Sequence, residues 1–337
     1  MTEDVAVPPR LAVLDDYQRI SRQMADWSTL DGLCAIEVFD RPLASIDEAV
    51  AALTPFRMIS LMRERMPVPR ALLERLPNLE LLVLTGTRSP SLDLEAATDH
   101  GIIVSHTGGG PSQHATPELA WGLILSAARH LAAEDRNIRA GGWQSTLGLT
   151  LHGRTLGVLG LGKLGSRVAE IGRAFGMNVI AWSPNLTVER AAAGGARRVD
   201  KDELFAESDV LSIHMVLSDR SRGLVGAREL GLMRPDAILV NTSRGPIIDE
   251  AALIETLRAD RIGCAALDVY DREPLSVDHP LRGLSNTVLS PHLGYVTRET
   301  YRVFFTDTVE AVRGFLAGAP VRVMNPEVLK RGTRQSR

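Results

Sequence analysis

The sequence predicts an α/β protein with two doubly wound domains. Short apolar runs of strand type alternate with segments of helical spacing along both halves of the chain, which is typical of parallel sheets covered by helices. Between the halves, residues 105–117 read SHTGGGPSQHATP and are too rich in glycine and proline for regular structure. This segment predicts a domain boundary with a hinge.

The first half contains five apolar runs that are long enough for strands. The expected strands are residues 11–14, 35–39, 58–61, 81–84 and 102–104, and helices are expected at 70–76 and 92–99. This alternation makes the first half a small α/β unit.

The second half opens with a strand and a glycine-rich turn. After the apolar run 156–159, Gly160, Gly162 and Gly165 occupy the positions of a G-x-G-x-x-G motif. The first glycine permits a tight turn, the second lets backbone approach a pyrophosphate, and the third lets the helix pack closely on the strand. Because a helix N-terminus also favours an anion, the pattern predicts a dinucleotide site.

The residues after this turn support the same interpretation. Val168, Ile171 and Phe175 have the spacing of an amphipathic helix, and residues 179–182 form a second strand. An acid at the end of that strand would bond the ribose 2′-hydroxyl of NAD, but the sequence has Ser183 there. Since serine does not repel a 2′-phosphate, NAD and NADP are both admissible, and Ser183 with Asn185 is expected to bond the phosphate of NADP.

Further strands and helices follow in alternation. The remaining expected strands are residues 210–214, 237–241, 264–268 and 287–289. Asp202 and Asp249 stand where a carboxylate can cap a helix. Residues 118–134 have helical spacing and are apolar on most sides, which predicts burial between domains or against a second subunit, and so a homodimer. An amphipathic helix over residues 300–316 could return the chain to the first domain.

Composition and charge limit the classes of partner. The 337 residues are 45% hydrophobic and 23% charged, and the net charge of -3 gives no reason to expect nucleic acid or an anionic membrane as partner. No apolar run has the length of a membrane-spanning helix, and MTEDVAVPPR lacks the pattern of a signal peptide, so a cytoplasmic location is expected. Cys34 and Cys264 lie in apolar segments and predict reduced core residues, and no metal site is expected.

Three polar residues follow expected strands of the second half: Arg244 in NTSRGP, Glu273 in DREP and His292 in SPHLG. Taken singly, each could be structural, as a surface ion pair, a solvated turn residue or a hydrogen-bonded histidine. Strand carboxyl ends are, however, where doubly wound folds bind ligands. Together the three fit hydride transfer to a carbonyl carbon, with His292 as acid or base, Arg244 holding an acidic substrate and Glu273 tuning the histidine.

Over nearly its whole length the chain resembles the D-isomer-specific 2-hydroxyacid dehydrogenases. The matching segments, in the family's order, are GLGKLG (160–165), NTSRG (241–245), ALDVYDREP (266–274) and PHLG (291–294). The resemblance implies that His292 is the general acid/base, that Glu273 is its charged partner, and that Arg244 binds the substrate carboxylate and carbonyl. It also implies that Asp268 bonds the nicotinamide carboxamide. The further cofactor-binding residues in the matching segments are Lys163, Leu164, Thr242 and Gly294.

The same resemblance implies a Rossmann NAD(P)-binding domain, residues 113–299, inserted into a flavodoxin-like substrate domain made of residues 1–112 and 300–337. It places the substrate carboxylate on the loop LTGTRSP, through Thr85, Gly86, Thr87 and Arg88. Arg88 departs from the family pattern of this loop. It points either outward as a solvated charge, which is the ordinary case for arginine, or inward as an extra anchor, and Arg63 poses the same question.

The function implied is hydride transfer between NAD(P)H and a small 2-keto or D-2-hydroxy acid. Two alternatives stay open, an NAD(P)-sensing regulatory protein on the same fold and a phosphite-type oxidoreductase that keeps the same three polar groups. The intact Arg244, Glu273 and His292 favour an enzyme over a sensor. The formate-oxidising branch is disfavoured because it carries an amide where Glu273 stands.

Overall fold

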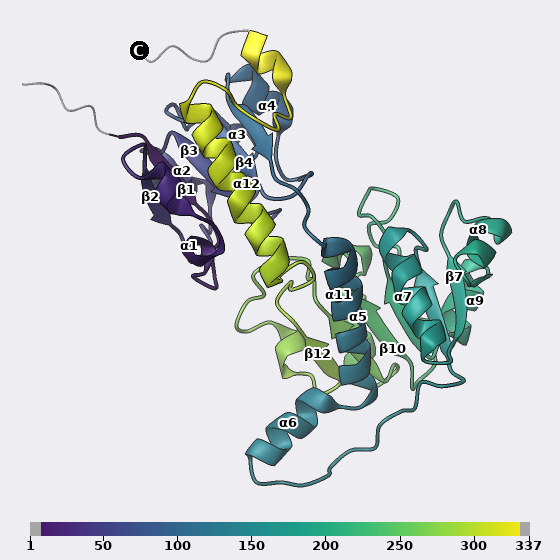
Figure 1. The fold of residues 1–337 in the computed structure, drawn as a ribbon. Coiled ribbons are helices and arrows are strands. Elements are labelled where there is room, and N and C mark those ends of the chain that lie inside the picture. The colour runs from purple at the N-terminus through teal and green to yellow at the C-terminus, as the bar shows by residue number, and fades with distance from the viewer. Residues whose placement is uncertain (1–7, 331–337) are drawn as a thin grey trace, which may run out of the picture. The chain divides into compact units, whose positions relative to one another are not determined.

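A computed structural model describes residues 8–330, and the chain divides into two compact units (Figure 1). Unit 1 comprises Met1–Pro111 and Thr297–Arg337, and unit 2 comprises Ser112–Val296. The expected boundaries at 112 and 299 lie within one and three residues of these crossings. The acidic N-terminal residues 1–7, used above for the expected location, lie outside the described residues.

Unit 1 is built on a parallel sheet in the order β2-β1-β3-β4-β5, which is the flavodoxin-like order. Its strands are β1 (Arg10–Val13), β2 (Ala35–Val38), β3 (Met58–Leu61), β4 (Leu81–Leu84) and β5 (Ile103–His106). Its helices are α1 (Ser21–Met24), η1 (Trp27–Leu30), α2 (Ile46–Leu53), α3 (Arg70–Leu73), α4 (Leu94–Asp99), α12 (Arg298–Leu316) and η4 (Pro326–Lys330), where η marks 3₁₀ turns. Helix α12 contacts β4 and β5, so the last part of the chain completes the unit that the first part began.

Unit 2 holds a parallel sheet in the order β12-β11-β10-β9-β6-β7-β8, the Rossmann order with one more strand at the edge. Its strands are β6 (Thr155–Leu159), β7 (Asn178–Trp182), β8 (Arg197–Arg198), β9 (Val210–Ile213), β10 (Ile238–Asn241), β11 (Cys264–Leu267) and β12 (Thr287–Leu289). Its helices are α5 (Ser112–Ala128), α6 (Leu131–Arg139), α7 (Lys163–Ala174), α8 (Val188–Ala193), α9 (Lys201–Glu207), α10 (Ala227–Leu232), η2 (Gly245–Ile247), α11 (Glu250–Arg258) and η3 (Pro280–Gly283). The expected two-domain α/β fold is confirmed. Among the strands of the described residues, β8 alone was not predicted, because its two arginines carry no apolar pattern.

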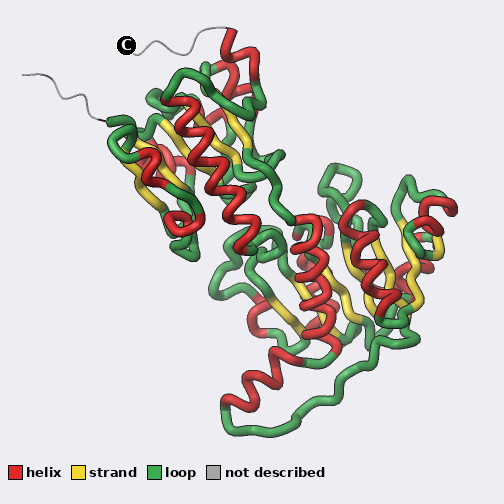
Figure 2. Tube along the Cα trace, in the orientation of Figure 1, coloured by secondary structure: helices red, strands yellow, loops and turns green. Residues whose placement is uncertain are grey.

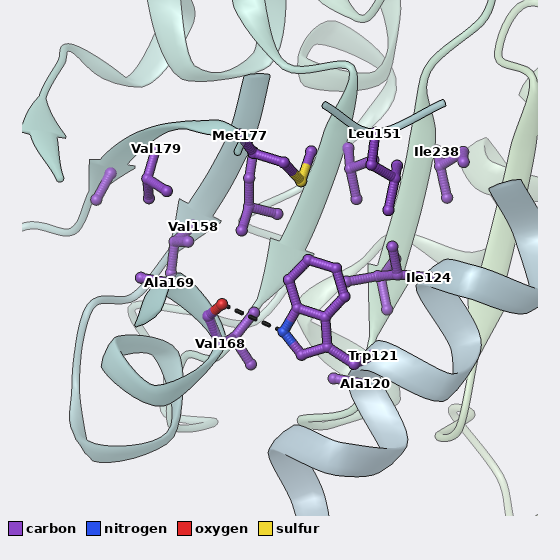
Figure 3. Packing of buried hydrophobic residues seen from close by; sticks show 14 of the residues in the cluster. Ala120, Trp121, Ile124, Leu151, Val158, Val168, Ala169, Met177, Val179 and Ile238 are labelled. Atoms are coloured by element: carbon purple, nitrogen blue, oxygen red, sulfur yellow. Dashed lines mark hydrogen bonds between the residues drawn. The ribbon is translucent and has the colours of Figure 1, made fainter. Parts of the chain in front are cut away.

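Helices cover both faces of this sheet (Figure 2). Successive residues of β10 enter opposite cores, with Ile238 on one face and Leu239 on the other. Figure 3 shows the first core, where Trp121 of α5 lies against α7 and its indole Nε1 donates to the Val168 carbonyl at 3.2 Å. The same ring stacks on Phe175 with centroids 4.7 Å apart.

Two helix expectations were wrong. Helix α5 begins at Ser112 inside the segment expected to be irregular and contains Pro117, because burial of the helix against the sheet outweighs the hydrogen bond that the proline removes. The apolar stretch 118–134 does not form one helix, since His130 adopts a left-handed conformation with φ 52° between α5 and α6. The apolar side chains of α5 pack on the sheet of their own unit, which accounts for the burial expected there.

The two expected helix caps had different outcomes. Asp249 caps α11, accepting a hydrogen bond from the Ala252 N–H at 3.1 Å, as expected. Asp202 is not a cap, since Asp200 is the N-cap residue of α9 and Asp202 pairs with Arg228 on the surface. The choice failed because two aspartates stand two residues apart and either fits the pattern.

Both cysteines are free thiols, as expected, but only Cys264 is a core residue. Cys34 is partly exposed, so its expected place in the core was wrong, because it lies in the turn before the edge strand β2. Burial raises the pKa of the Cys264 thiol to about 12, so this residue is unreactive at neutral pH. Between residues 8 and 330, none of the helices has the length and apolarity needed to cross a membrane.

Candidate active site

The glycine turn between β6 and α7 has the geometry that its motif predicts. Gly160 has φ +101°, a conformation that side chains rarely adopt. A Cβ on Gly165 would lie 2.1 Å from the Gly160 carbonyl oxygen, so this position must be glycine for the helix to pack. Apart from Gly162 itself and its two chain neighbours, no described residue has an atom within 4 Å of the place where a Cβ of Gly162 would stand, and Gly162 is the N-cap of α7. The first N–H groups of α7 therefore border open space suited to an anion.

Thr242, at the end of β10, supports a ligand on this edge of the sheet. Its side chain is buried, and its Oγ1 has no hydrogen-bond partner among the described residues. A buried hydroxyl without a partner is costly, so such a group commonly serves a ligand. Together with the open space over Gly162, this orphan hydroxyl fits the expected dinucleotide.

His214 is a residue of this edge that the sequence interpretation missed. It follows β9, beside β6, where the strand order reverses, and its backbone carbonyl lies against Gly160. Its Nε2 is 2.8 Å from the Ser212 hydroxyl, and burial lowers the pKa of His214 to about 4, so the ring is neutral. Its place at the end of an expected strand was a usable signal.

Arg244 stands on a loop that its neighbours lock in place. The Asn241 side chain accepts from the Ser243 N–H at 3.0 Å and donates to the Arg244 carbonyl at 2.9 Å. The Arg244 guanidinium donates through Nη1 to the Ser243 carbonyl at 2.6 Å. A Cβ on Gly245 would lie 2.0 Å from the Tyr270 carbonyl carbon, so glycine lets the loops after β10 and β11 touch.

The structure brings Glu273 and His292 together. Glu273 Oε2 lies 2.6 Å from His292 Nδ1, while Glu273 Oε1 accepts from the Tyr270 N–H at 3.0 Å. The two side chains are 31% and 24% exposed, so the pair is partly screened from water. With Nδ1 facing the carboxylate, Nε2 is the ring nitrogen that can exchange a proton with a ligand.

Asp268, which directly follows β11, is hydrogen-bonded to the loop that carries His292. Its backbone carbonyl accepts from the His292 N–H at 2.9 Å, and its carboxylate accepts from the N–H groups of Leu293 and Gly294 at 2.7 and 2.9 Å. The Ser290 hydroxyl donates to the same carboxylate. Burial raises the pKa of Asp268, and these hydrogen bonds act in the opposite direction.

In unit 1, the expected substrate loop follows β4. Gly86 has φ +84° and its N–H donates to the Thr107 hydroxyl at 2.7 Å, while Thr85 Oγ1 accepts from the Arg63 N–H at 2.8 Å. A Cβ on Gly86 would lie 1.7 Å from Arg63 Nη1, so the Arg63 guanidinium lies on this loop. Arg88 is exposed, and its neighbour Thr87 is exposed as well. Arg63 therefore points toward the Gly86 loop, whereas Arg88 points into solvent.

Among the other expected cofactor residues, Lys163 and Asn185 are exposed, Ser183 and Leu164 are partly buried, and Gly294 is buried. Except for the substrate loop, all expected site residues follow strands of the one sheet in unit 2 or lie on the loops and first helical turn that follow them. No group of three or more metal-ligating side chains occurs in the described part of the chain.

Most of the chain is similar to proteins of one known family. Residues 121–294 match the family described as D-isomer specific 2-hydroxyacid dehydrogenase, NAD binding domain. A glyoxylate reductase of Aeropyrum pernix is 42% identical over 269 residues, which cover 77% of this chain and 80% of that protein. The crystal structure of a phosphoglycerate oxidoreductase from Vibrio cholerae superimposes with a TM-score of 0.86 at 38% identity and covers 92% of this chain and 100% of that one.

A second curated relative is longer than this chain. The D-3-phosphoglycerate dehydrogenase of Archaeoglobus fulgidus is 36% identical over 305 residues, which cover 90% of this chain but only 57% of that protein. The chain therefore spans little more than half the length of this relative.

Proposed function

This chain belongs to the D-isomer specific 2-hydroxyacid dehydrogenase family, and from that premise we propose which of its residues carry out the reaction. The chain is an NAD(P)-dependent oxidoreductase that acts on 2-hydroxy and 2-keto acids. The observation that carries the assignment of residues is the contact of 2.6 Å between Glu273 and His292. A histidine oriented by a carboxylate is the arrangement that general acid–base catalysis requires.

In reduction, His292 donates the proton on Nε2 to the carbonyl oxygen of the keto acid. The bound dinucleotide supplies the hydride that the carbonyl carbon accepts. Glu273 stabilises the imidazolium before the transfer, and the neutral ring takes a new proton from solvent afterwards. Arg244 pairs with the substrate carboxylate and polarises the carbonyl, since a guanidinium offers several donors in one plane.

The substrate class is tested by offering the purified protein NADPH or NADH with glyoxylate, hydroxypyruvate, pyruvate or phenylpyruvate. The glyoxylate reductase among its relatives makes glyoxylate the first compound to try. Oxidation of the dinucleotide that depends on a keto acid supports the proposal. If no keto acid causes oxidation of either dinucleotide, the proposed substrate class is wrong.

Glu273→Gln should lower kcat for reduction by about tenfold, the scale of one charge-assisted hydrogen bond. The carboxylate oxygen 2.6 Å from His292 Nδ1 orients the imidazole and makes a charge-assisted bond with it, and a neutral amide makes only a weaker one. The measurement is kcat at saturating substrate and dinucleotide, and an unchanged kcat would remove Glu273 from this role.

We propose that NADPH is used at least as efficiently as NADH. Ser183 directly follows β7 and stands in place of an acid, and Asn185 follows two residues later. Arg190 of α8 donates through Nη1 to the Asn185 carbonyl at 3.3 Å, so a cation lies at the loop that would meet a 2′-phosphate. A nearby positive charge favours that phosphate over a bare hydroxyl.

Ser183→Asp should lower kcat/KM for NADPH by about tenfold, because the new carboxylate would repel the 2′-phosphate. Ser183→Ala is the control for loss of the hydroxyl without added charge, and it should lower this value much less. Steady-state kinetics with both dinucleotides measure the effect. A parent that greatly prefers NADH, together with an aspartate variant that changes neither value, would place discrimination elsewhere.

We also propose a homodimer whose interface includes α6 and the segment after it, which extend away from the sheet of unit 2 (Figure 1). Helix α6 has no buried residue, and large apolar side chains are exposed there at Leu131 and Ile138, and beyond it at Trp143 and Leu147. A patch of this kind marks an interaction surface.

Light scattering should give a molar mass twice that of one chain. The double variant Leu147→Ser, Trp143→Ser should lower this mass toward that of a single chain, because both exposed apolar side chains are lost. A parent with the mass of one chain would exclude the dimer.

A further inference from the structure

We propose that Asp268 and Ser290 form a clamp that holds the His292 loop in its working conformation, which makes both of them positioning residues of the reaction. The inference rests on the proposed function, because it takes His292 as the acid/base. It adds a role for Asp268 to the expected bond with the nicotinamide carboxamide, and it gives a role to Ser290, which the sequence pattern did not single out.

The backbone of His292 needs outside support. Its φ is +55°, in the left-handed region that residues other than glycine rarely adopt and that persists only where neighbouring contacts determine it. Three successive N–H groups, from His292 to Gly294, all donate to Asp268, at 2.7 to 2.9 Å. These bonds account for the unusual conformation.

Ser290 closes the clamp from the start of the loop. Its hydroxyl donates to Asp268 Oδ1, which also accepts from Leu293, and its own N–H donates to the Leu267 carbonyl at 2.8 Å. Asp268 is fully buried, so its carboxylate depends on these protein donors for its solvation. Loss of the hydroxyl would weaken the acceptor that fixes the loop.

The clamp also sets the distance within the acid–base pair. The Tyr270 N–H orients Glu273, and Asp268 orients His292. Both partners are therefore held by residues of the short segment 268–270 that follows β11. The carboxylate of Asp268 has both oxygens engaged by the loop. Placement of the His292 loop therefore depends on this carboxylate, which keeps acceptor capacity for the expected bond from the nicotinamide carboxamide.

The test compares Ser290→Ala with Ser290→Thr, which keeps a hydroxyl, and with Ser208→Ala. Ser208 is a matched control, because it is a fully buried serine of the same unit whose hydroxyl donates to the Leu204 backbone carbonyl. We expect Ser290→Ala to speed amide hydrogen exchange at Leu293 and Gly294 about tenfold and to lower kcat about fivefold, with the dissociation constant of NADPH changed less than twofold. Ser290→Thr should recover most of kcat, and Ser208→Ala should change none of these values.

Asp268→Asn tests the acceptor of the clamp. The asparagine amide nitrogen donates and cannot accept, so one of the two loop N–H groups loses its partner, and the clamp predicts faster loop exchange in the protein without added dinucleotide. Unchanged exchange of the loop in Asp268→Asn and Ser290→Ala would overturn the proposal, and so would a loss of NADPH affinity in Ser290→Ala as large as its loss in kcat. If the parent reduces no keto acid, the proposed function fails, while exchange and NADPH affinity still decide whether the clamp exists.

Discussion

His292→Ala should lower kcat for keto-acid reduction by at least about a hundredfold, the scale on which general acid–base groups act. Dinucleotide affinity should change little, because the glycine turn and the helix N-terminus that border the expected cofactor site follow β6, whereas His292 follows β12. Without the imidazole, the carbonyl oxygen has only water as a proton source while it gains negative charge. The measurement is kcat at saturating substrate, together with direct titration of NADPH.

A matched control for this variant exists in the same unit. His279 also faces a glutamate, with its Nε2 3.1 Å from Glu250 Oε1. It precedes η3, and its side-chain hydrogen bonds to described residues go to Glu250 and Leu281 and not to Glu273 or His292. His279→Ala should therefore keep nearly full kcat. If His292→Ala retains most of its turnover, or if both variants lose activity equally, the assigned acid/base is wrong.

Most of the fold could be predicted because the signals that determine it are local. Strands buried on both faces are continuous apolar runs, as in β10, and two glycines of the turn after β6, Gly160 and Gly165, each meet a separate steric demand. One failure occurred where tertiary packing overrode local propensity. Pro117 lies within α5 because the surrounding helix is buried against the sheet, and no single-sequence rule weighs that burial against one lost hydrogen bond.

The candidate site was predictable to the extent that it depends on strand order. Arg244, Glu273 and His292 could be proposed together because consecutive parallel strands end at one edge. Other residues of the site were not found in the same way. His214 stood at the end of an expected strand but was not singled out, and Ser290 looks like an ordinary strand-end residue in the sequence. The contact of Arg63 with Gly86 depends on how the loops after β3 and β4 fold over one another.

Arg244→Lys should lower kcat/KM for the keto acid by at least roughly tenfold, although the charge is kept. The loop backbone is fixed by Asn241, and Gly245 packs against Tyr270, so the loop cannot move to compensate for a different side chain. Lysine ends in one ammonium group, whereas the guanidinium can donate to a carboxylate and a carbonyl oxygen at once. Loss of one charge-assisted hydrogen bond corresponds to about this factor.

Arg258→Lys provides the comparison, since Arg258 is exposed in the last turn of α11 and its replacement should leave kcat/KM unchanged. The informative measurement is kcat/KM at saturating dinucleotide for a keto acid and for a simple aldehyde without the carboxylate. If Arg244 binds the carboxylate, Arg244→Lys should reduce the preference for the acid over the aldehyde. Near-normal kinetics with both compounds would mean that Arg244 serves the loop through its bond to Ser243 and not the substrate.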